Sequence, residues 1–307
     1  MKMRNPLLLA WIVGALASTF PARATVDCRP ELKASFELGT DWYGGVYVPA
    51  RVSGMSLKLL VDTGGTYSML TESTVASLGL FRHRSRSPGM ALYGGETLDH
   101  FVMVNDMRIG TITANTTDFL VMPDARLPSE LSGTLAPDVL SRFDVDFDFA
   151  HARLNLFTPK RCGGPVPLSA SGTIDRIPIR LDNQNHVIIP VQVDGRNLTA
   201  YLDTGASRSE MSMEAARDLF GLRQNSSGVR PLIEADGGEG IFYYPFKALT
   251  FDGVTVNAPY LPLVPNRLAR RPLGGPQLIL GMAVLRHYHL YIAYSERYLY
   301  VTPATAH

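Results

Sequence analysis

The sequence lacks any excess of charge of one sign. Its 307 residues include 29 Lys and Arg against 28 Asp and Glu, which gives a formal net charge of +1. No basic stripe with interleaved aromatic residues is present, so nothing in the composition indicates a nucleic acid or an anionic membrane as partner. Hydrophobic residues make up 46% and charged residues 19%, which is typical of a globular protein with length for one large or two small cores.

Several motifs of common enzyme and cofactor sites are absent as well. No Gly-x-Ser-x-Gly element indicates a serine hydrolase, and no glycine-rich loop with a lysine indicates a nucleotide site. His287 and His289 would face the same side of an extended strand, but no matched set of His or Cys ligands accompanies them. We therefore expect neither a metal nor a cofactor.

The first residues of the chain have the pattern of a secretory signal. Lys2 and Arg4 supply a positive start, residues 7–17 form a short apolar run, and residues 22–24 form a small-x-small cleavage site. The run is too short for a typical membrane span. The pattern predicts a signal peptide over residues 1–24, a periplasmic or secreted mature chain, and no stable membrane insertion after cleavage. An uncleaved anchor is the alternative.

Cysteine is scarce, and the two in the chain are Cys28 and Cys162. An exported chain meets an oxidising compartment, in which disulfides persist. We therefore predict that the two cysteines pair and tie the N-terminal segment to the stretch that joins the two halves of the chain. Alkylation of both thiols in the unreduced protein would contradict this pairing. Two buried or unpaired thiols are the alternative.

One sequence pattern occurs twice. Residues 60–65 read Leu-Val-Asp-Thr-Gly-Gly, and residues 201–206 read Tyr-Leu-Asp-Thr-Gly-Ala. An apolar segment ending in proline precedes each copy, at residues 46–49 and 187–190. The offset stays at about 141 residues, so the chain contains an internal duplication. The apolar residues before Asp-Thr-Gly place each aspartate at the end of a buried strand, on a turn that the glycine permits.

An isolated Asp-Thr-Gly is often an ordinary turn, in which the aspartate hydrogen-bonds its own backbone. Two copies on a duplicated scaffold favour a functional role for the pair of aspartates. A hairpin turn is expected before each copy, at Gly54 and at Asp194-Gly195, where Asp-Gly is a strong signal for a type I′ turn.

The two motifs resemble those of the aspartic peptidases, retropepsin-like or pepsin-like, and most closely the single-chain, two-copy form of the retropepsin-like group. Ile279-Leu280-Gly281 adds to the resemblance, which covers roughly residues 40–302. It implies an all-β, bilobal acid-protease fold, with two duplicated β-barrel-like lobes, short helices and a cleft between the lobes. The expected parts are an N-terminal lobe over residues 25–158, a linker over 159–175 and a C-terminal lobe over 176–307.

The resemblance also implies roles for the motif residues. Asp62 and Asp203 would form a catalytic dyad that shares one proton and activates a water, with no cofactor. Thr63 and Thr204 would brace the two loops by hydrogen bonds across a pseudo-twofold axis. The glycines that follow would let the backbone approach the carboxylates closely; they are Gly64 and Gly205. The substrate would be a peptide or protein, cleaved internally, and a monomer would suffice because one chain supplies both aspartates.

A Gly-Gly-Glu tip follows each aspartate by about 30 residues and is expected to form a hairpin. By resemblance, the two tips would be flaps that close over a bound peptide, one per lobe as in retropepsins. Plain exposed hairpins are the alternative. The flap residues expected to contact substrate are Tyr93, Gly94, Gly95, Gly237 and Gly238.

The first lobe departs from the family pattern at two places. Ala136-Pro137 stands where the second lobe has Gly281-Met282, and Gly65 stands where the family usually has Ala or Ser. We expect the alanine methyl and the proline ring to shift the following helix and weaken the support of Asp62. This departure keeps open a second function, that of a catalytically silent peptide-binding protein on the same fold.

Overall fold

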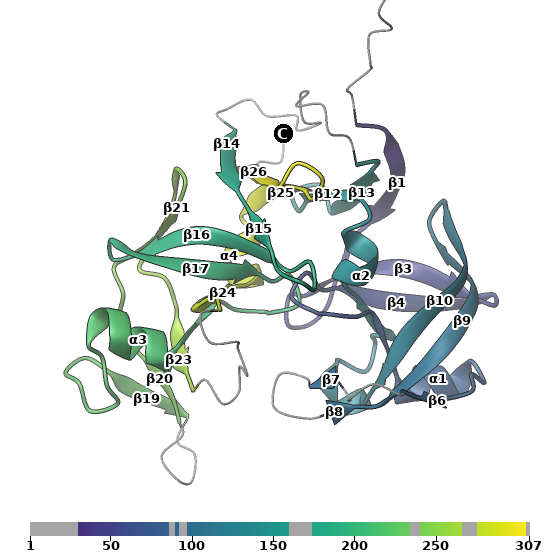
Figure 1. The fold of residues 1–307 in the computed structure, drawn as a ribbon, viewed down its shortest axis with the longest axis horizontal. Coiled ribbons are helices and arrows are strands. Elements are labelled where there is room, and N and C mark those ends of the chain that lie inside the picture. The colour runs from purple at the N-terminus through teal and green to yellow at the C-terminus, as the bar shows by residue number, and fades with distance from the viewer. Residues whose placement is uncertain are drawn as a thin grey trace, which may run out of the picture.

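The computed structural model describes residues 30–85, 90–91, 97–159, 174–233, 240–265 and 275–304. These residues are mostly in β-strands and form two lobes that are joined by a shared sheet (Figure 1). The predicted all-β, bilobal acid-protease fold is confirmed.

The sheet of the first lobe is built around two hairpins. Its strands are β2 (Gly39–Thr40), β3 (Val46–Val52), β4 (Met55–Val61), β5 (Met69–Thr71), β6 (His83–Arg84), β9 (His100–Ile109), β10 (Ile112–Met122) and β11 (Gly133–Leu135). They lie in the order β2-β3-β4-β11-β5-β10-β9-β6. Buried and exposed residues alternate along β3, as expected for a strand with one face on the core.

The sheet of the second lobe repeats this plan. Its strands are β15 (Arg180–Leu181), β16 (Val187–Val193), β17 (Arg196–Leu202), β18 (Glu210–Ser212), β19 (Arg230–Ile233), β20 (Ile241–Tyr243), β21 (Ala248–Phe251), β22 (Val254–Asn257), β23 (Pro262–Val264) and β24 (Leu278–Leu280). The order is β19-β20-β23-β18-β24-β17-β16-β21-β22, with β15 beside β16. The predicted turns before each Asp-Thr-Gly are confirmed, since Ser53-Gly54 and Asp194-Gly195 all have positive φ.

A third sheet takes strands from both halves of the chain and joins the lobes. Its strands are β1 (Leu32–Glu37), β12 (Asp144–Asp148), β13 (Arg153–Phe157), β14 (Asp175–Pro178), β25 (Tyr288–Ala293) and β26 (Tyr298–Pro303). Strands β12 and β25 meet at its centre, with Val145 opposite Ile292. On the same strands, His289 Nε2 lies 2.7 Å from Asp146 Oδ1, so an ion pair also links the halves.

The helices are short. They are α1 (Glu72–Ser77), the 3-10 helix η1 (Asp124–Arg126), α2 (Pro137–Leu140), α3 (Met213–Phe220) and α4 (Met282–Leu285). Side chains cap α1 and α3, because Thr71 accepts a hydrogen bond from the N–H of Thr74 and Ser212 from that of Ala215. Among the helices of the described residues, none has the length and apolarity needed to span a bilayer.

The duplication fixes where each aspartate lies. In the first lobe, β11 lies between β4 and β5, parallel to β4 and antiparallel to β5. In the second lobe, β24 has the same relation to β17 and β18. The ends of β4 and β17 therefore lie at the middle of the molecule and come from opposite sides. Each is paired with a strand that follows later in the sequence of its own lobe, β11 in the first lobe and β24 in the second.

The strands that flank the predicted flaps form antiparallel pairs. In the first lobe, β7 (Met90–Ala91) pairs with β8 (Thr97–Leu98), and in the second lobe β19 pairs with β20. Both pairs lie on the side of the molecule opposite the shared sheet, one on each lobe (Figure 1). The flap residues themselves lie outside the described residues, as do residues 1–24, both cysteines and residues 160–173 of the predicted linker.

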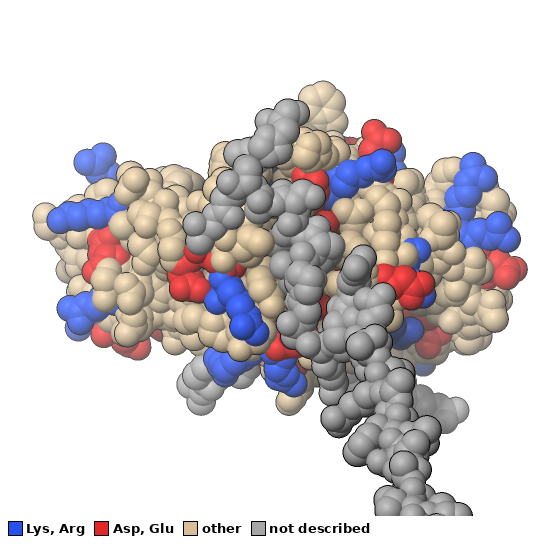
Figure 2. Space-filling model, turned by 90° about the horizontal axis from the view of Figure 1, so that it is seen from above, with Lys and Arg blue, Asp and Glu red and all other residues tan. Residues whose placement is uncertain are grey.

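Charges of both signs are interspersed over the face seen from above (Figure 2). This distribution agrees with the balanced net charge of the chain.

Candidate active site

Asp62 and Asp203 each lie one residue beyond a buried strand. The N–H of Asp62 donates to the carbonyl of Leu135 at 2.9 Å, and the N–H of Asp203 donates to that of Leu280 at 3.0 Å. Each aspartate is thus pinned to the strand that lies beside its own. The buried residue Val61 ends β4 and Leu202 ends β17, so burial of these side chains fixes where each loop begins.

Backbone amides bind both carboxylates in the same way. Oδ1 of Asp62 accepts hydrogen bonds from the N–H groups of Gly64 at 3.1 Å and Gly65 at 2.8 Å. Oδ1 of Asp203 accepts from Gly205 at 2.8 Å and Ala206 at 3.0 Å. The second oxygen of each carboxyl group is not used in these bonds and remains for a ligand or for the other carboxyl.

The structure brings the two carboxyl groups together, since each lies against the glycine that follows the aspartate of the opposite lobe. The two motif glycines make this approach sterically allowed. A β-carbon at Gly64 would overlap the carboxyl group of Asp203, and one at Gly205 would overlap that of Asp62. Each glycine therefore leaves room for the aspartate of the opposite lobe.

The two threonines join the loops through four hydrogen bonds. Thr63 Oγ1 donates to the carbonyl of Leu202 at 2.7 Å and accepts from the N–H of Thr204 at 3.0 Å. Thr204 Oγ1 donates to the carbonyl of Val61 at 2.6 Å and accepts from the N–H of Thr63 at 3.1 Å. Both side chains are buried, so water does not compete for these bonds.

The environment favours one shared proton on the pair. Each aspartate retains some exposed surface, but protein atoms crowd its carboxyl group. Desolvation raises the pKa of Asp62, against the opposing effect of the amides of Gly65 and Gly64. Desolvation, together with the negative charge on Asp62, raises the pKa of Asp203 to about 8. Two such close carboxyls titrate as a unit, and the pair keeps one proton far above the ordinary range of an aspartate.

The expected shift of the helix after Ala136-Pro137 is wrong. Helix α2 begins at Pro137 and α4 at Met282, in the same place relative to the strand before them. Ser68 Oγ accepts the N–H of Ala136 at 3.0 Å, and Ser209 Oγ accepts that of Gly281 at 3.0 Å. Proline is well suited to the first position of a helix, where its missing N–H costs no intrahelical bond.

The alanine methyl is accommodated because of the second departure. A β-carbon at Gly65 would lie 3.3 Å from Cβ of Ala136, so the glycine leaves space for the methyl. The second lobe has the reverse arrangement, with Ala206 and Gly281. The strand and helix beside Asp62 are therefore placed like those beside Asp203, and this departure no longer favours the silent peptide-binding protein.

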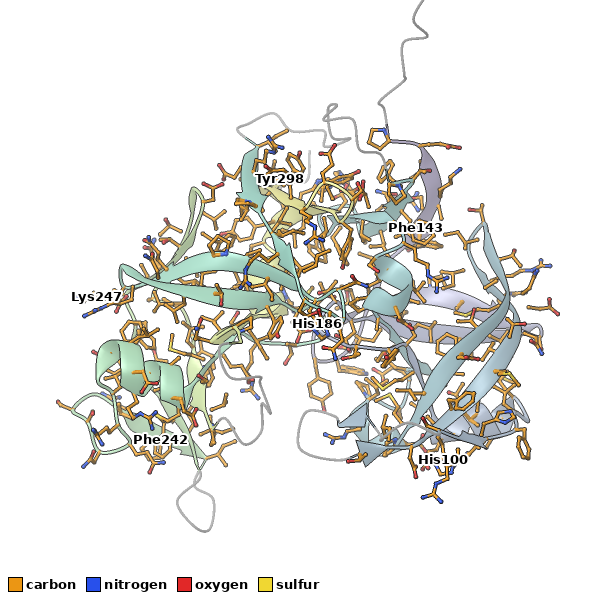
Figure 3. All side chains as sticks on the ribbon, in the orientation of Figure 1. His100, Phe143, His186, Phe242, Lys247 and Tyr298 are labelled. Carbon is orange, nitrogen blue, oxygen red and sulfur yellow. The ribbon has the colours of Figure 1, made fainter. Side chains whose placement is uncertain are left out.

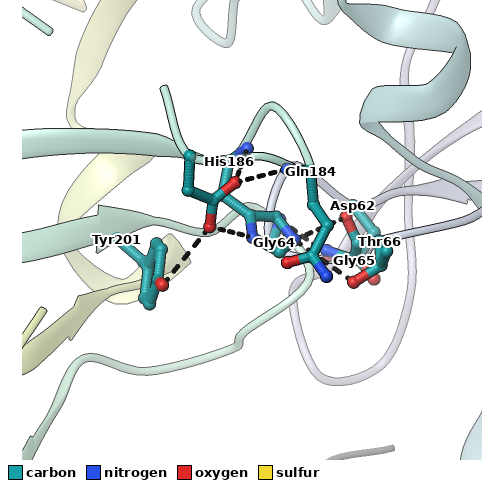
Figure 4. Close-up of polar contacts among 8 residues, drawn as sticks. Asp62, Gly64, Gly65, Thr66, Gln184, His186 and Tyr201 are labelled. Atoms are coloured by element: carbon teal, nitrogen blue, oxygen red, sulfur yellow. Dashed lines mark hydrogen bonds and ion pairs between the residues drawn. The ribbon is translucent and has the colours of Figure 1, made fainter. Parts of the chain in front are cut away.

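Sequence reasoning missed one polar residue at the site. His186 of the second lobe reaches the loop of the first, where its Nε2 lies 3.1 Å from the carbonyl of Gly65 (Figure 4). Its Nδ1 lies 2.8 Å from Oδ2 of Asp182. The duplication contained a signal, since Asp41 and Asp182 begin matching loops that end at Gly45 and His186. A histidine in place of a glycine was the visible difference.

A pair of carboxyl groups with a shared proton, on braced loops of two duplicated lobes, defines a two-lobed acid-protease site. A family model described as aspartyl protease matches residues 48–136 and 189–284, which is more than half of the chain. The chain therefore belongs to the aspartyl protease family, a family of peptide hydrolases. A search of curated proteins found no match.

Proposed function

We propose that the protein is an aspartic endopeptidase that hydrolyses peptide bonds with a water held between Asp62 and Asp203. The observation that supports this proposal best is the approach of the two carboxyl groups at loops of opposite lobes, which favours one shared proton on the pair. The ionised carboxyl would take a proton from the water, and the protonated one would donate to the scissile carbonyl oxygen. No covalent intermediate and no cofactor is needed.

Two backbone amides bind each carboxylate, so the pair shares its proton rather than holding it on one named aspartate. The carboxylate that takes a proton from the water would become the acid of the next step, because that proton must be returned when the products form.

We propose that the substrate is an extended segment of a peptide or protein, bound as an added strand. Support comes from the two hairpin stems, β7 with β8 and β19 with β20, one on each lobe. A flap from each lobe is the retropepsin arrangement. The flap residues would then be those expected from the sequence, around Tyr93 and Gly237.

The compartment and the oligomeric state are proposals of the same kind. We propose that residues 1–24 direct export and are removed, so that the enzyme acts in the periplasm or outside the cell. The N-terminal residue of the isolated protein tests this directly, and a chain that keeps residues 1–24 would contradict it. A monomer suffices for activity because one chain supplies both aspartates.

The first experiment is cleavage of an unbiased peptide library across a pH series, with and without pepstatin. Cuts that disappear in Asp203→Asn would identify the peptidase and report its specificity at once. Circular dichroism of the variant serves as the control for folding. A folded wild-type chain that cuts no peptide at any pH, yet binds pepstatin, would refute the endopeptidase and favour a peptide-binding protein.

A further inference from the structure

The backbone carbonyl that follows each Asp-Thr-Gly is bound differently in the two lobes. In the second lobe, the carbonyl of Ala206 accepts the N–H of Met282, the first residue of α4, at 2.8 Å. The corresponding first residue of α2 is Pro137, and proline has no backbone N–H to donate. The carbonyl of Gly65 therefore cannot have the partner that its counterpart has.

His186 supplies a donor to this carbonyl from the opposite lobe. The side chain lies between the lobes (Figure 3) and is 11% exposed. Its Nε2 lies 3.1 Å from the carbonyl oxygen of Gly65 and 3.5 Å from Oγ1 of Thr66. The ring meets the ring of Tyr201 edge to face, with centroids 5.5 Å apart, which fixes its orientation.

The groups around the imidazole determine what each ring nitrogen can bind. Burial would raise the pKa of Asp182, but hydrogen bonds from His186 and from the N–H of Gln184 outweigh it and lower this pKa, so Asp182 is an acceptor. Its Oδ2 faces Nδ1 of the ring at 2.8 Å. The carbonyl oxygen of Gly65, which faces Nε2, can only accept a hydrogen bond, so the ring binds it with a proton on Nε2.

We propose that His186 is a positioning residue of the catalytic loop and replaces, from the other lobe, the backbone N–H that Pro137 removes. The residue that it holds is Gly65, whose own N–H donates to Oδ1 of Asp62 at 2.8 Å. Loss of the His186 side chain would remove the hydrogen bond to the carbonyl of Gly65 and would loosen the amide of the same residue, which is one of the two amides on the carboxylate. The kinetic consequence rests on the proposed peptidase function.

The kinetic test is a double-mutant cycle between His186 and Pro137. Loss of the donor to a buried carbonyl predicts that His186→Leu lowers kcat by about tenfold to a hundredfold with little change in KM. Pro137→Ala restores the N–H at the start of α2, and the kcat of the double variant should return to within about threefold of that of Pro137→Ala alone. The kcat of His186→Gln, whose amide can donate to the same carbonyl, should fall less than that of His186→Leu.

A matched control removes a histidine that pairs with an aspartate elsewhere. His289→Leu breaks the pair with Asp146 in the shared sheet, away from the dyad. Pro137→Ala should give no rescue of His289→Leu. Rescue of both histidine variants would mean that Pro137→Ala stabilises the protein in general, and it would overturn the specific role of His186.

Two measurements need no peptidase activity. In wild-type protein, the ¹⁵N resonances of the His186 ring should show a proton on Nε2, the nitrogen that faces the carbonyl of Gly65. Thermal unfolding should show the same rescue as the kinetics, with the Tm of the double variant above that of His186→Leu. If the wild type cleaves no peptide, the proposed function fails while these measurements still decide the role of His186. A ring without a proton on Nε2, or no rescue of Tm, overturns the inference.

Discussion

Thr204→Val removes one hydroxyl from the centre of the molecule and nearly preserves the volume of the side chain. In the wild type, this hydroxyl donates to the carbonyl of Val61 at 2.6 Å and accepts from the N–H of Thr63 at 3.1 Å. Both bonds cross between the lobes and are buried. Each deprived backbone group costs about 1–3 kcal/mol, so we expect a loss of about 2–5 kcal/mol in the free energy of unfolding.

Urea unfolding followed by circular dichroism measures this loss. Thr63→Val should lose a similar amount, because Oγ1 of Thr63 makes the mirror-image bonds to Leu202 and Thr204. Thr116→Val is the control, since its hydroxyl binds Asn105 on the surface and its removal should change stability by less than about 0.5 kcal/mol. A Thr204→Val chain as stable as this control would refute the idea that these four bonds hold the two loops together.

Three further predictions concern the carboxyl groups. Asp62→Asn and Asp203→Asn should each lower kcat for peptide cleavage by about a thousandfold or more while the circular dichroism spectrum is kept, and full activity in either would refute the shared proton. The pKa of Asp203 is raised to about 8 in the native state. Between about pH 4 and pH 8, the native state therefore keeps a proton that the unfolded chain has released, so the free energy of unfolding falls as pH rises. The Tm of Asp203→Asn relative to wild type should therefore increase across that range, and a constant difference would contradict the shift. Ser68→Ala should cost about 1–3 kcal/mol in urea unfolding, more than Ser209→Ala, because Ser68 also donates to the half-buried Asp138 at 2.8 Å; equal losses would count against that bond.

The strands around the site could be predicted because their pattern is local. Alternating burial in residues 46–52 and the positive φ of Asp194-Gly195 follow from side-chain type and turn chemistry alone. The meeting of Asp62 with Asp203 was implied by the resemblance to aspartic peptidases, and the duplicated Asp-Thr-Gly motif was the feature that supported this resemblance. The repeat thus indicated a contact between two residues far apart in the chain, which a single copy of the motif would not have indicated.

The shared sheet and the role of His186 could not be predicted from local pattern. The pairing of β12 with β25 joins residues that are far apart in the chain, and Asp146 finds His289 only because those strands meet. In the same way, the acceptor of His186 belongs to the other lobe. A lone histidine near a turn is compatible with many partners, and only the three-dimensional neighbours show which bond it makes.

Each difference of the first lobe from the second is offset by a residue that lies close to it in space. Taken alone, Ala136 predicts a clash and Pro137 predicts a missing hydrogen bond. Each has its compensation at a residue that contacts the same loop: Gly65 leaves room for the methyl of Ala136, and His186 donates where Pro137 cannot. After the duplication, selection on such a site acts on the position of Asp62 relative to Asp203, so either lobe can change its residues if a neighbour restores the lost space or donor. The two backbone hydrogen bonds that hold the aspartates have nearly equal lengths, 2.9 Å and 3.0 Å, as such compensation should leave them.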